Sequence, residues 1–390
     1  MGHDSALPVD PGSFIRSRPY RALLVLAALI GLVVSVASWA FLELVHGIQH
    51  LVYEDLPDAV GYDAAPVWWP LPWLALAGLL TALAIDRFPG HAGHVPADGL
   101  KTGGEPTQPI ELPGILLAAL ATLGLGLVLG PEAPLIAIGV ALGILSLRLV
   151  RRDAPRQALG LMAAAGSFAA VSTIFGSPVI GAVLIIEATG LGGAILPLVL
   201  LPGLLAAGIG SLVFIGLGSW SGLSTSAWQL SPFPLQAYGG PGWGDFFWTV
   251  LLALLMAVLA FAILEAARWS KRVVDLRPYP LMVAAGLLVG GCAIAFAELT
   301  DESTDAVLFS GQSAFGTLFD PAGSPAASTL VLLFLFKGLA WGVSLGNFRG
   351  GPTFPAIFLG AVAGLVAADL PGYAETQAVA ALVGATCVSV

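Results

Sequence analysis

Residues 130–143 read Gly-Pro-Glu-Ala-Pro-Leu-Ile-Ala-Ile-Gly-Val-Ala-Leu-Gly. Residues 351–364 read Gly-Pro-Thr-Phe-Pro-Ala-Ile-Phe-Leu-Gly-Ala-Val-Ala-Gly. Both follow the pattern G-P-x-x-P-x-x-x-x-G-x-x-x-G, and each matched residue is displaced by the same 221 positions, since 351 − 130 equals 364 − 143. A constant displacement indicates an internal repeat. A weaker similarity pairs residues 165–166 with residues 383–384.

The repeated motif is typical of the start of a helix. Proline lacks the backbone N–H that the first helical turn leaves unpaired, so proline is favoured there. Gly130 follows an apolar stretch, and we therefore expect the helix that opens near Pro134 to begin inside a membrane. Its free N–H groups and positive dipole end would attract an anion. The alternative is a pair of proline-kinked helices that pack through their glycines.

The composition indicates a membrane protein. The chain has 390 residues, of which 57% are apolar and 10% are charged, whereas soluble proteins have about 25% charged residues. We therefore predict an all-α polytopic membrane protein, because a membrane helix needs about 20 mostly apolar residues. The expected spans are residues 22–42, 69–85, 112–129, 134–147, 158–186, 194–217, 246–264, 280–296, 329–345 and 353–368.

Charge and cysteine content exclude several partners. The net charge is −9 and no basic tract is present, which argues against nucleic acid as a partner. Cys292 and Cys387 are far apart in apolar stretches, so we expect neither a disulfide framework nor a thiolate metal cluster. No cofactor is expected, and the lipid bilayer is the predicted surroundings.

Glu132 is the candidate functional residue within the motif. It is an ionisable carboxylate in the otherwise uncharged stretch 112–147, where insertion costs roughly 2.5–3.5 kcal/mol. At a helix N-terminus it would occupy an anion site as a tethered anion, and it would leave that site when it is protonated or when a free anion competes. Glu132 would then act as a gate and a proton acceptor. The alternative is a buried helix-capping carboxylate.

These residues resemble a known family. Residues 126–134, Gly-Leu-Val-Leu-Gly-Pro-Glu-Ala-Pro, are similar to the G-x-x-x-G-[RK]-E-G-P loop of CLC chloride channels and proton-coupled chloride exchangers. Residues 166–187 resemble the family's broken helix pair with its terminal acid, residues 350–355 its G-G-x-F-x-P loop, and residues 93–96 its G-S-G-I-P loop. The resemblance implies two inverted-topology repeats with broken, re-entrant helices, and a homodimer that transports chloride or a similar small anion.

The same resemblance implies roles for individual residues. Glu132 corresponds to the gate, and Glu187 lies where a proton path would reach the inner side. The implied anion-binding residues are Gly93, His94, Val95, Pro131, Ala133, Pro352, Thr353 and Phe354.

Several departures from the family pattern leave anion selectivity and proton coupling open. Gly93 stands where the family has a serine whose hydroxyl helps to bind chloride, and His94 stands where it has a glycine. Pro352 removes one backbone donor, while Pro131 replaces the basic residue before the gate. Ala188 follows Glu187 where exchangers often have a second glutamate. Both a channel-like pathway and proton-coupled transport therefore stay possible interpretations.

The predicted organisation has four parts. Residues 1–19 form a cytoplasmic N-terminal arm by the positive-inside rule, residues 20–218 the first membrane repeat, residues 219–244 a connector and residues 245–390 the second repeat. The resemblance implies that the second repeat stops before its last helices and the family's pore tyrosine. The expected location is the cell membrane.

Two alternatives come from other chemistry. Membrane-embedded Glu132 and Glu187, together with the chain's histidines, could instead serve a cation or metal carrier. A hydrolase is disfavoured, because residues 311–315 miss the G-x-S-x-G pattern, and no enzymatic activity is expected. Lys337 lies in an apolar stretch, where it would need a carboxylate, a set of carbonyls or an anion pathway.

Overall fold

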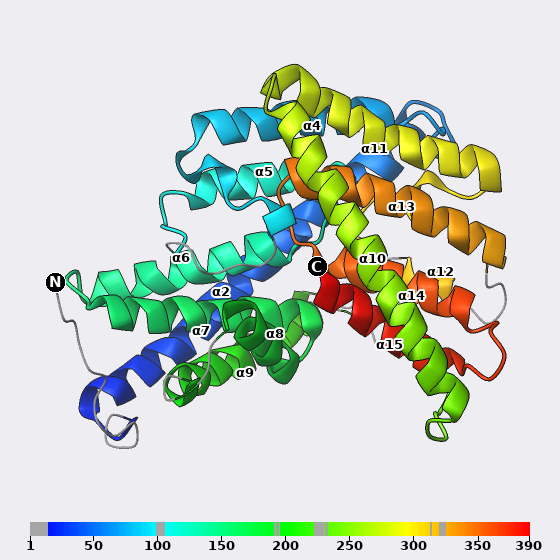
Figure 1. The fold of residues 1–390 in the computed structure, drawn as a ribbon. Coiled ribbons are helices and arrows are strands. Elements are labelled where there is room, and N and C mark those ends of the chain that lie inside the picture. The colour runs from blue at the N-terminus through cyan, green and yellow to red at the C-terminus, as the bar shows by residue number, and fades with distance from the viewer. Residues whose placement is uncertain are drawn as a thin grey trace. The chain divides into compact units, whose positions relative to one another are not determined.

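The computed structural model describes residues 15–98, 106–190, 193, 196–221, 230, 233–312, 314–319 and 325–390. These residues form helices, and in this part of the chain the β-structure is a single bridged residue pair. The α-helices, labelled in Figure 1, are α2 (Arg18–His50), α3 (Leu56–Ala59), α4 (Pro70–Arg87), α5 (Leu112–Gly124), α6 (Glu132–Val150), α7 (Arg156–Phe175), α8 (Pro178–Thr189), α9 (Leu196–Ser221), α10 (Trp243–Val274), α11 (Pro278–Thr300), α12 (Phe315–Leu318), α13 (Ala327–Asn347), α14 (Thr353–Ala367) and α15 (Glu375–Ser389).

The predicted all-α polytopic membrane architecture is confirmed. Seven helical segments in the described part of the chain are long and apolar enough to cross a membrane, whereas the apolar helices α5 and α14 are only 13 and 15 residues long. The stretch expected at residues 158–186 is divided into α7 and α8 by Gly176, whose φ of 61° is left-handed, and by Pro178 at the start of α8. Short and broken helices of this kind are the ones that the repeat predicted.

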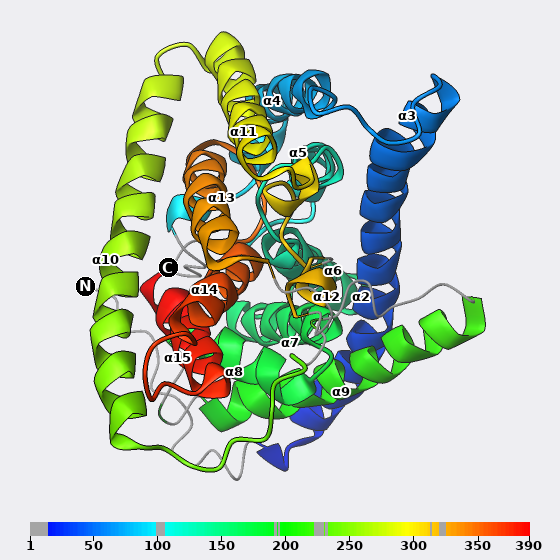
Figure 2. The ribbon, with the colours of Figure 1, turned by 90° about the vertical axis from the view of Figure 1, so that its right-hand side faces the viewer.

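The chain folds into two compact units. The first comprises residues 1–42, 100–112 and 135–230, and in it α7 packs against α8 and α9. The second comprises residues 43–99, 113–134 and 231–390, and in it α4 packs on α11, α10 on α13, and α14 on α15, as Figures 1 and 2 show. Most of the predicted N-terminal arm and part of the predicted connector lie outside the described residues. The division into repeats at 20–218 and 245–390 stays a prediction.

Glycines of the repeated motif permit close helix contacts in each unit. In the first unit, a Cβ atom on Gly139 would overlap the backbone of Gly166. In the second unit, a Cβ atom on Gly360 would lie 2.5 Å from the Cα atom of Val383. The contact partners of the two motif copies are therefore Gly166 and Val383, whereas the sequence comparison paired Gly166 with Gly384. Small residues at these positions let backbones approach each other, as is common in membrane helix pairs.

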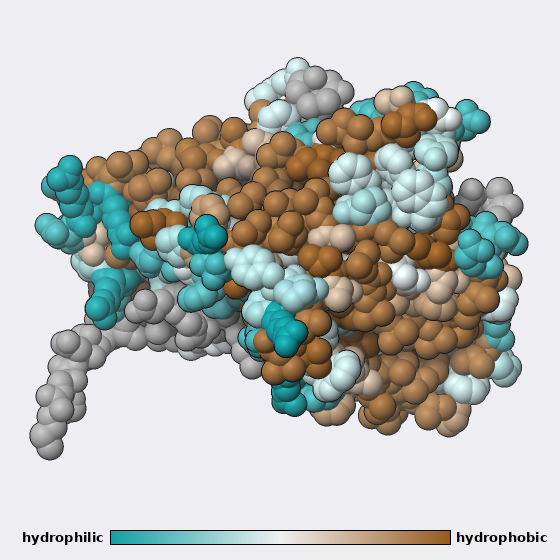
Figure 3. Space-filling model, turned by 90° about the horizontal axis from the view of Figure 1, so that it is seen from above, coloured by the Kyte–Doolittle hydropathy of each residue, from teal (hydrophilic) through white to brown (hydrophobic). Residues whose placement is uncertain are grey.

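The exterior of α10 is apolar along most of its length. Val250, Leu254 and Val258 are each more than 60% exposed, at 61%, 64% and 63%. An apolar surface of this kind is unfavourable in water but matches lipid tails. Much of the face in Figure 3 is likewise brown. The protein is an integral membrane protein.

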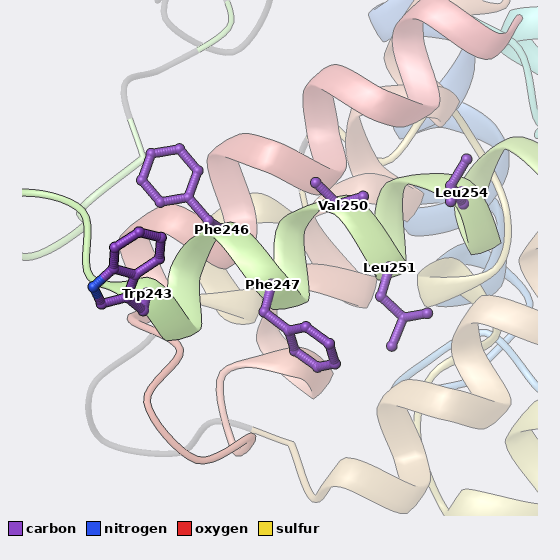
Figure 4. Close-up of a pocket in the computed structure, with 6 residues that line it drawn as sticks. All are labelled: Trp243, Phe246, Phe247, Val250, Leu251 and Leu254. Carbon is purple, nitrogen blue, oxygen red and sulfur yellow. The ribbon is translucent and has the colours of Figure 1, made fainter.

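A shallow hollow on α10 is not the functional site. The side chains that line it project from one stretch of the helix in Figure 4, and all are apolar or aromatic: Trp243, Phe246, Phe247, Val250, Leu251 and Leu254. A hollow without a charged lining residue gives an ion nothing to replace its hydration shell. It is better explained as part of the lipid-facing surface.

Candidate functional site

The two copies of the repeated motif meet at Gly130 and Gly351. These residues form an antiparallel bridge in which the Gly130 N–H donates to the Gly351 carbonyl at 2.7 Å and the Gly351 N–H donates to the Gly130 carbonyl at 2.6 Å. Each glycine stands just before a helix, α6 in the first copy and α14 in the second. The bridge therefore fixes the place where both helices begin, and it satisfies backbone groups that would otherwise be unpaired in an apolar interior.

Glu132 is fully buried beside this bridge, with 0% of its surface exposed. Its Oε1 atom accepts a hydrogen bond of 2.7 Å from the backbone N–H of Phe354, whereas its Oε2 atom is buried without a hydrogen-bond partner. Because α14 begins at Thr353, the Phe354 N–H belongs to the first turn, which has no acceptor within its own helix. The carboxylate thus lies at the positive end of α14, a position that favours a negative charge.

The carboxylate fills the space that Gly130 and Gly351 leave open. A Cβ atom on either residue would overlap the Oε2 atom of Glu132. For Gly130, all three nearest atoms belong to the carboxylate group. The same space, emptied of the carboxylate, would present the Phe354 N–H to a free anion. Glycine is needed at Gly130 for this close approach and not for its backbone angles, since Gly130 is absent from the described glycines with positive φ.

The other predicted loop residues surround Glu132. Pro131 is buried and precedes α6, while Ala133 is partly buried in the first turn of that helix. Pro352 precedes α14, and Thr353 begins it. Two of these four residues are prolines, which restrict the backbone conformation of the loop but have no N–H to donate. Among the predicted anion-binding residues of this loop, Phe354 donates its backbone N–H to the carboxylate at 2.7 Å, and the backbone N–H and hydroxyl of Thr353 also interact with it.

The predicted residues Gly93, His94 and Val95 follow an unusual turn. Gly90, His91, Ala92 and Gly93 all have positive φ values, of 72°, 49°, 57° and 90°. Left-handed backbone is unfavourable for His91 and Ala92, and such strain often occurs at functional positions. His94 is exposed, whereas Gly93 is partly buried. The structure connects this turn to the Gly350–Thr353 loop through Arg349, whose Nη2 atom donates to the His91 carbonyl at 3.3 Å.

Arg349 was not predicted as a site residue. It is 7% exposed, and its backbone N–H donates to Thr122 Oγ1 at 3.3 Å. A signal was present in the sequence, since Arg349 stands two residues before the second copy of the repeated motif, and Glu132 lies within the first copy. An isolated charge in a membrane segment is costly and is a candidate for function.

Lys337 has a structural role. Its Nζ atom donates to four consecutive carbonyls, those of residues 306–309, at distances of 3.0, 3.0, 2.9 and 3.3 Å, and it lies 4.7 Å from the centre of the Phe358 ring. Of the alternatives that the sequence left open, the set of carbonyls is therefore the one that the structure contains. The ammonium group has no donor left for an anion pathway, since it has three N–H groups.

Glu187 lies in α8 within the first unit, three residues before the left-handed Gly190 that ends the helix. It is exposed, and its backbone carbonyl accepts the Gly190 N–H. A role in a proton path stays a prediction for Glu187.

One histidine of the metal-carrier alternative, His50, forms ion pairs. His50 lies 3.1 Å from carboxylate oxygens of both Glu54 and Asp55. Within the described ranges, no three His, Cys, Asp or Glu side chains are grouped so that they could hold a metal ion. The histidines therefore give this alternative no support.

Comparison with known proteins places these features in context. Residues 77–390 match the family described as voltage gated chloride channel. A Shigella boydii serotype 4 protein that carries the name ion-transport protein YfeO is 30% identical over 367 residues, which cover 90% of this chain and 80% of that protein. The fold resembles a slow cyanobacterial Cl−/H+ antiporter (TM-score 0.71, 20% identity, 89% of this chain and 79% of that one) and a CLC-type fluoride/proton antiporter (TM-score 0.70, 17% identity, 95% and 86%).

Proposed function

The chain belongs to the voltage gated chloride channel family, and on that premise we propose that it moves chloride or a similar small anion across a membrane, with Glu132 as the gate. The observation that carries this proposal is the hydrogen bond of 2.7 Å from the Phe354 N–H to the Glu132 carboxylate. A buried carboxylate held by the first turn of a helix occupies the kind of place where a free anion would bind.

Gating follows from the charge of Glu132. When ionised, the carboxylate is attracted by the N-terminus of α14 and keeps the space between Gly130 and Gly351 filled. Protonation removes the charge and with it most of this attraction, so the side chain is free to leave and a permeating anion takes its place. The anion is compensated for its lost hydration by the N–H groups that the carboxylate gives up.

Proton coupling depends on Glu132 as well. A carboxyl group that binds a proton each time it leaves the pathway couples proton movement to anion movement if it releases that proton on the other side of the membrane. Glu187 is the proposed relay toward the inner side, while Ala188 after it offers no second carboxylate. The relatives include structures described as antiporters, which favours testing coupling directly.

The proposed assembly is a homodimer with one pathway in each subunit. We place it in the cell membrane with the N-terminus in the cytoplasm, because Arg16, Arg18 and Arg21 precede or open the first span. The family consists of transport proteins, and we propose no enzymatic activity.

The test is ion efflux from proteoliposomes that contain the full chain. Chloride, nitrate, bromide and fluoride are supplied in turn while external pH is recorded, and wild type is compared with Glu132→Ala. Anion efflux with opposed proton movement that disappears in Glu132→Ala would indicate an exchanger. Anion efflux without proton movement would indicate a channel. Absence of flux for every anion would contradict the proposal.

A further inference from the structure

Arg349 is a buried cation whose hydrogen bonds are incomplete. Its Nη1 atom donates to the Phe348 carbonyl at 3.2 Å and its Nη2 atom donates to the His91 carbonyl at 3.3 Å, while its Nε atom is buried without a partner. A guanidinium group has five N–H donors, so these two bonds leave three of them unused within the described part of the chain. Donors left unpaired inside a protein are costly.

The charge of Arg349 is also unpaired. Asp98 and Asp275 attract the guanidinium from a distance, yet neither forms an ion pair with it, and none of the ion pairs among the described residues includes it. Carbonyl oxygens supply partial negative charge but no counter-ion. A buried cation without a counter-ion is strongly unfavourable, so the site is complementary to an anion.

The position of Arg349 connects two segments already singled out. Along the chain it stands two residues before Gly351, which pairs with Gly130 beside the Glu132 carboxylate. Across the second unit it reaches the left-handed turn at Gly90–Gly93, whose His91 residue is exposed. Its backbone N–H donates to Thr122, and its guanidinium contacts the turn through the His91 carbonyl.

The same two segments offer few other hydrogen-bond donors to an anion. Gly93 has no side chain, and Pro352 has no backbone N–H. The Arg349 guanidinium is therefore a strong hydrogen-bond donor in a region where Gly93 and Pro352 offer few donors.

We propose that Arg349 binds the transported anion beside the Gly90–Gly93 turn, and that it favours anions such as nitrate and chloride over fluoride. The inference rests on the proposed function and adds a specificity-determining residue to it. A guanidinium is planar, weakly hydrated and able to donate two parallel hydrogen bonds to a planar anion such as nitrate. Fluoride is strongly hydrated, and a single guanidinium does not replace that hydration.

The test is calorimetric titration of the solubilised full chain with sodium nitrate, chloride and fluoride, combined with efflux of the same anions from proteoliposomes. Arg349→Gln should weaken nitrate and chloride binding about tenfold or more, the range expected for a charge-assisted hydrogen bond. Arg349→Lys keeps the charge but not the planar fork, so it should keep chloride binding within about threefold and lose the preference for nitrate. Arg272→Gln is the matched control, because it removes the same charge from an exposed position on α10 and should change nothing.

The outcomes separate this inference from the proposed function. Flux that depends on Glu132 but is unchanged in Arg349→Gln, with an unchanged melting temperature, would overturn the role of Arg349 and leave the proposed function standing. Absence of anion flux in wild type would overturn both. If Arg349→Gln fails to fold, the titration and efflux of Arg349→Lys and of wild type provide the test. Fluoride binding to wild type more tightly than nitrate would then refute the inference.

Discussion

Gly130 carries no side chain because the carboxylate of Glu132 occupies the position of its Cβ atom. The three atoms nearest to a Cβ atom there all belong to the mobile end of the glutamate, so a methyl group would displace the carboxylate and leave the surrounding backbone in place. The position of the Glu132 side chain therefore depends on the absence of a side chain at Gly130.

Gly130→Ala is therefore expected to open the pathway. Displacing the carboxylate removes a charge-assisted hydrogen bond, and chloride efflux at high pH should rise about tenfold. Gly47→Ala is the matched control, since a Cβ atom there has no neighbour within 4 Å. In the background Glu132→Ala the Gly130→Ala change should have no further effect. A tenfold rise that persists in this background would contradict the mechanism.

The sequence indicates Glu132 as a candidate residue but not Arg349, and the reason is physical. Both are charges in apolar surroundings, but Glu132 lies within the repeated motif, whereas Arg349 lies just before it. The hydrogen bond from the Arg349 side chain to His91 joins residues 258 positions apart. No local pattern in the sequence indicates such a contact, so the residue's environment required the fold.

Lys337 holds a segment of the chain in place through hydrogen bonds to its carbonyls. Its ammonium group ties residues 306–309 to α13, and the backbone N–H of Phe309 in that segment donates to the Gly126 carbonyl at 3.1 Å. The segment thereby supports the start of the loop that leads to Gly130. Rigid support of this kind keeps a binding geometry within narrow limits.

Lys337→Met should destabilise the fold, since it leaves carbonyls without their donor. We expect the free energy of unfolding in detergent to fall by about 2–4 kcal/mol. Lys271→Met is the control, because Lys271 forms an exposed pair with Asp275 on α10, which contributes little. Equal stability of the two variants would show that the carbonyl contacts of Lys337 are energetically unimportant.

The helices themselves were largely predictable from apolar stretches and from prolines. The repeated motif predicted the starts of α6 and α14, and these helices begin at Glu132 and Thr353, which are again 221 positions apart. The contacts between helices were less predictable. The sequence pairs Gly166 with Gly384, but the helix contact is made by Val383.

The apolar composition and the repeat together indicate a membrane transport fold for the chain. What the sequence could not provide was the meeting of Gly130 with Gly351, since a bridge between residues 221 positions apart is a property of the folded chain. That bridge brings the gate and the N-terminus of α14 together.

The anion interpretation also predicts independence from metal ions. Chelation with EDTA should leave both the melting temperature and anion efflux of the full chain unchanged, because neither Glu132 nor the His50 ion pairs depend on a metal in this account. Addition of zinc should likewise have no stabilising effect. A large metal-dependent rise in melting temperature would favour the carrier alternative.

We expect Glu132 to gate an anion pathway by its charge, and chloride efflux measured as a function of pH in wild type and Glu132→Gln tests this gating. Glutamine has nearly the shape of the protonated glutamate and has no charge. Wild-type efflux should rise as pH falls, because protonation releases the side chain from α14, whereas Glu132→Gln should be active and independent of pH. A variant that keeps the pH dependence of wild type would contradict the account.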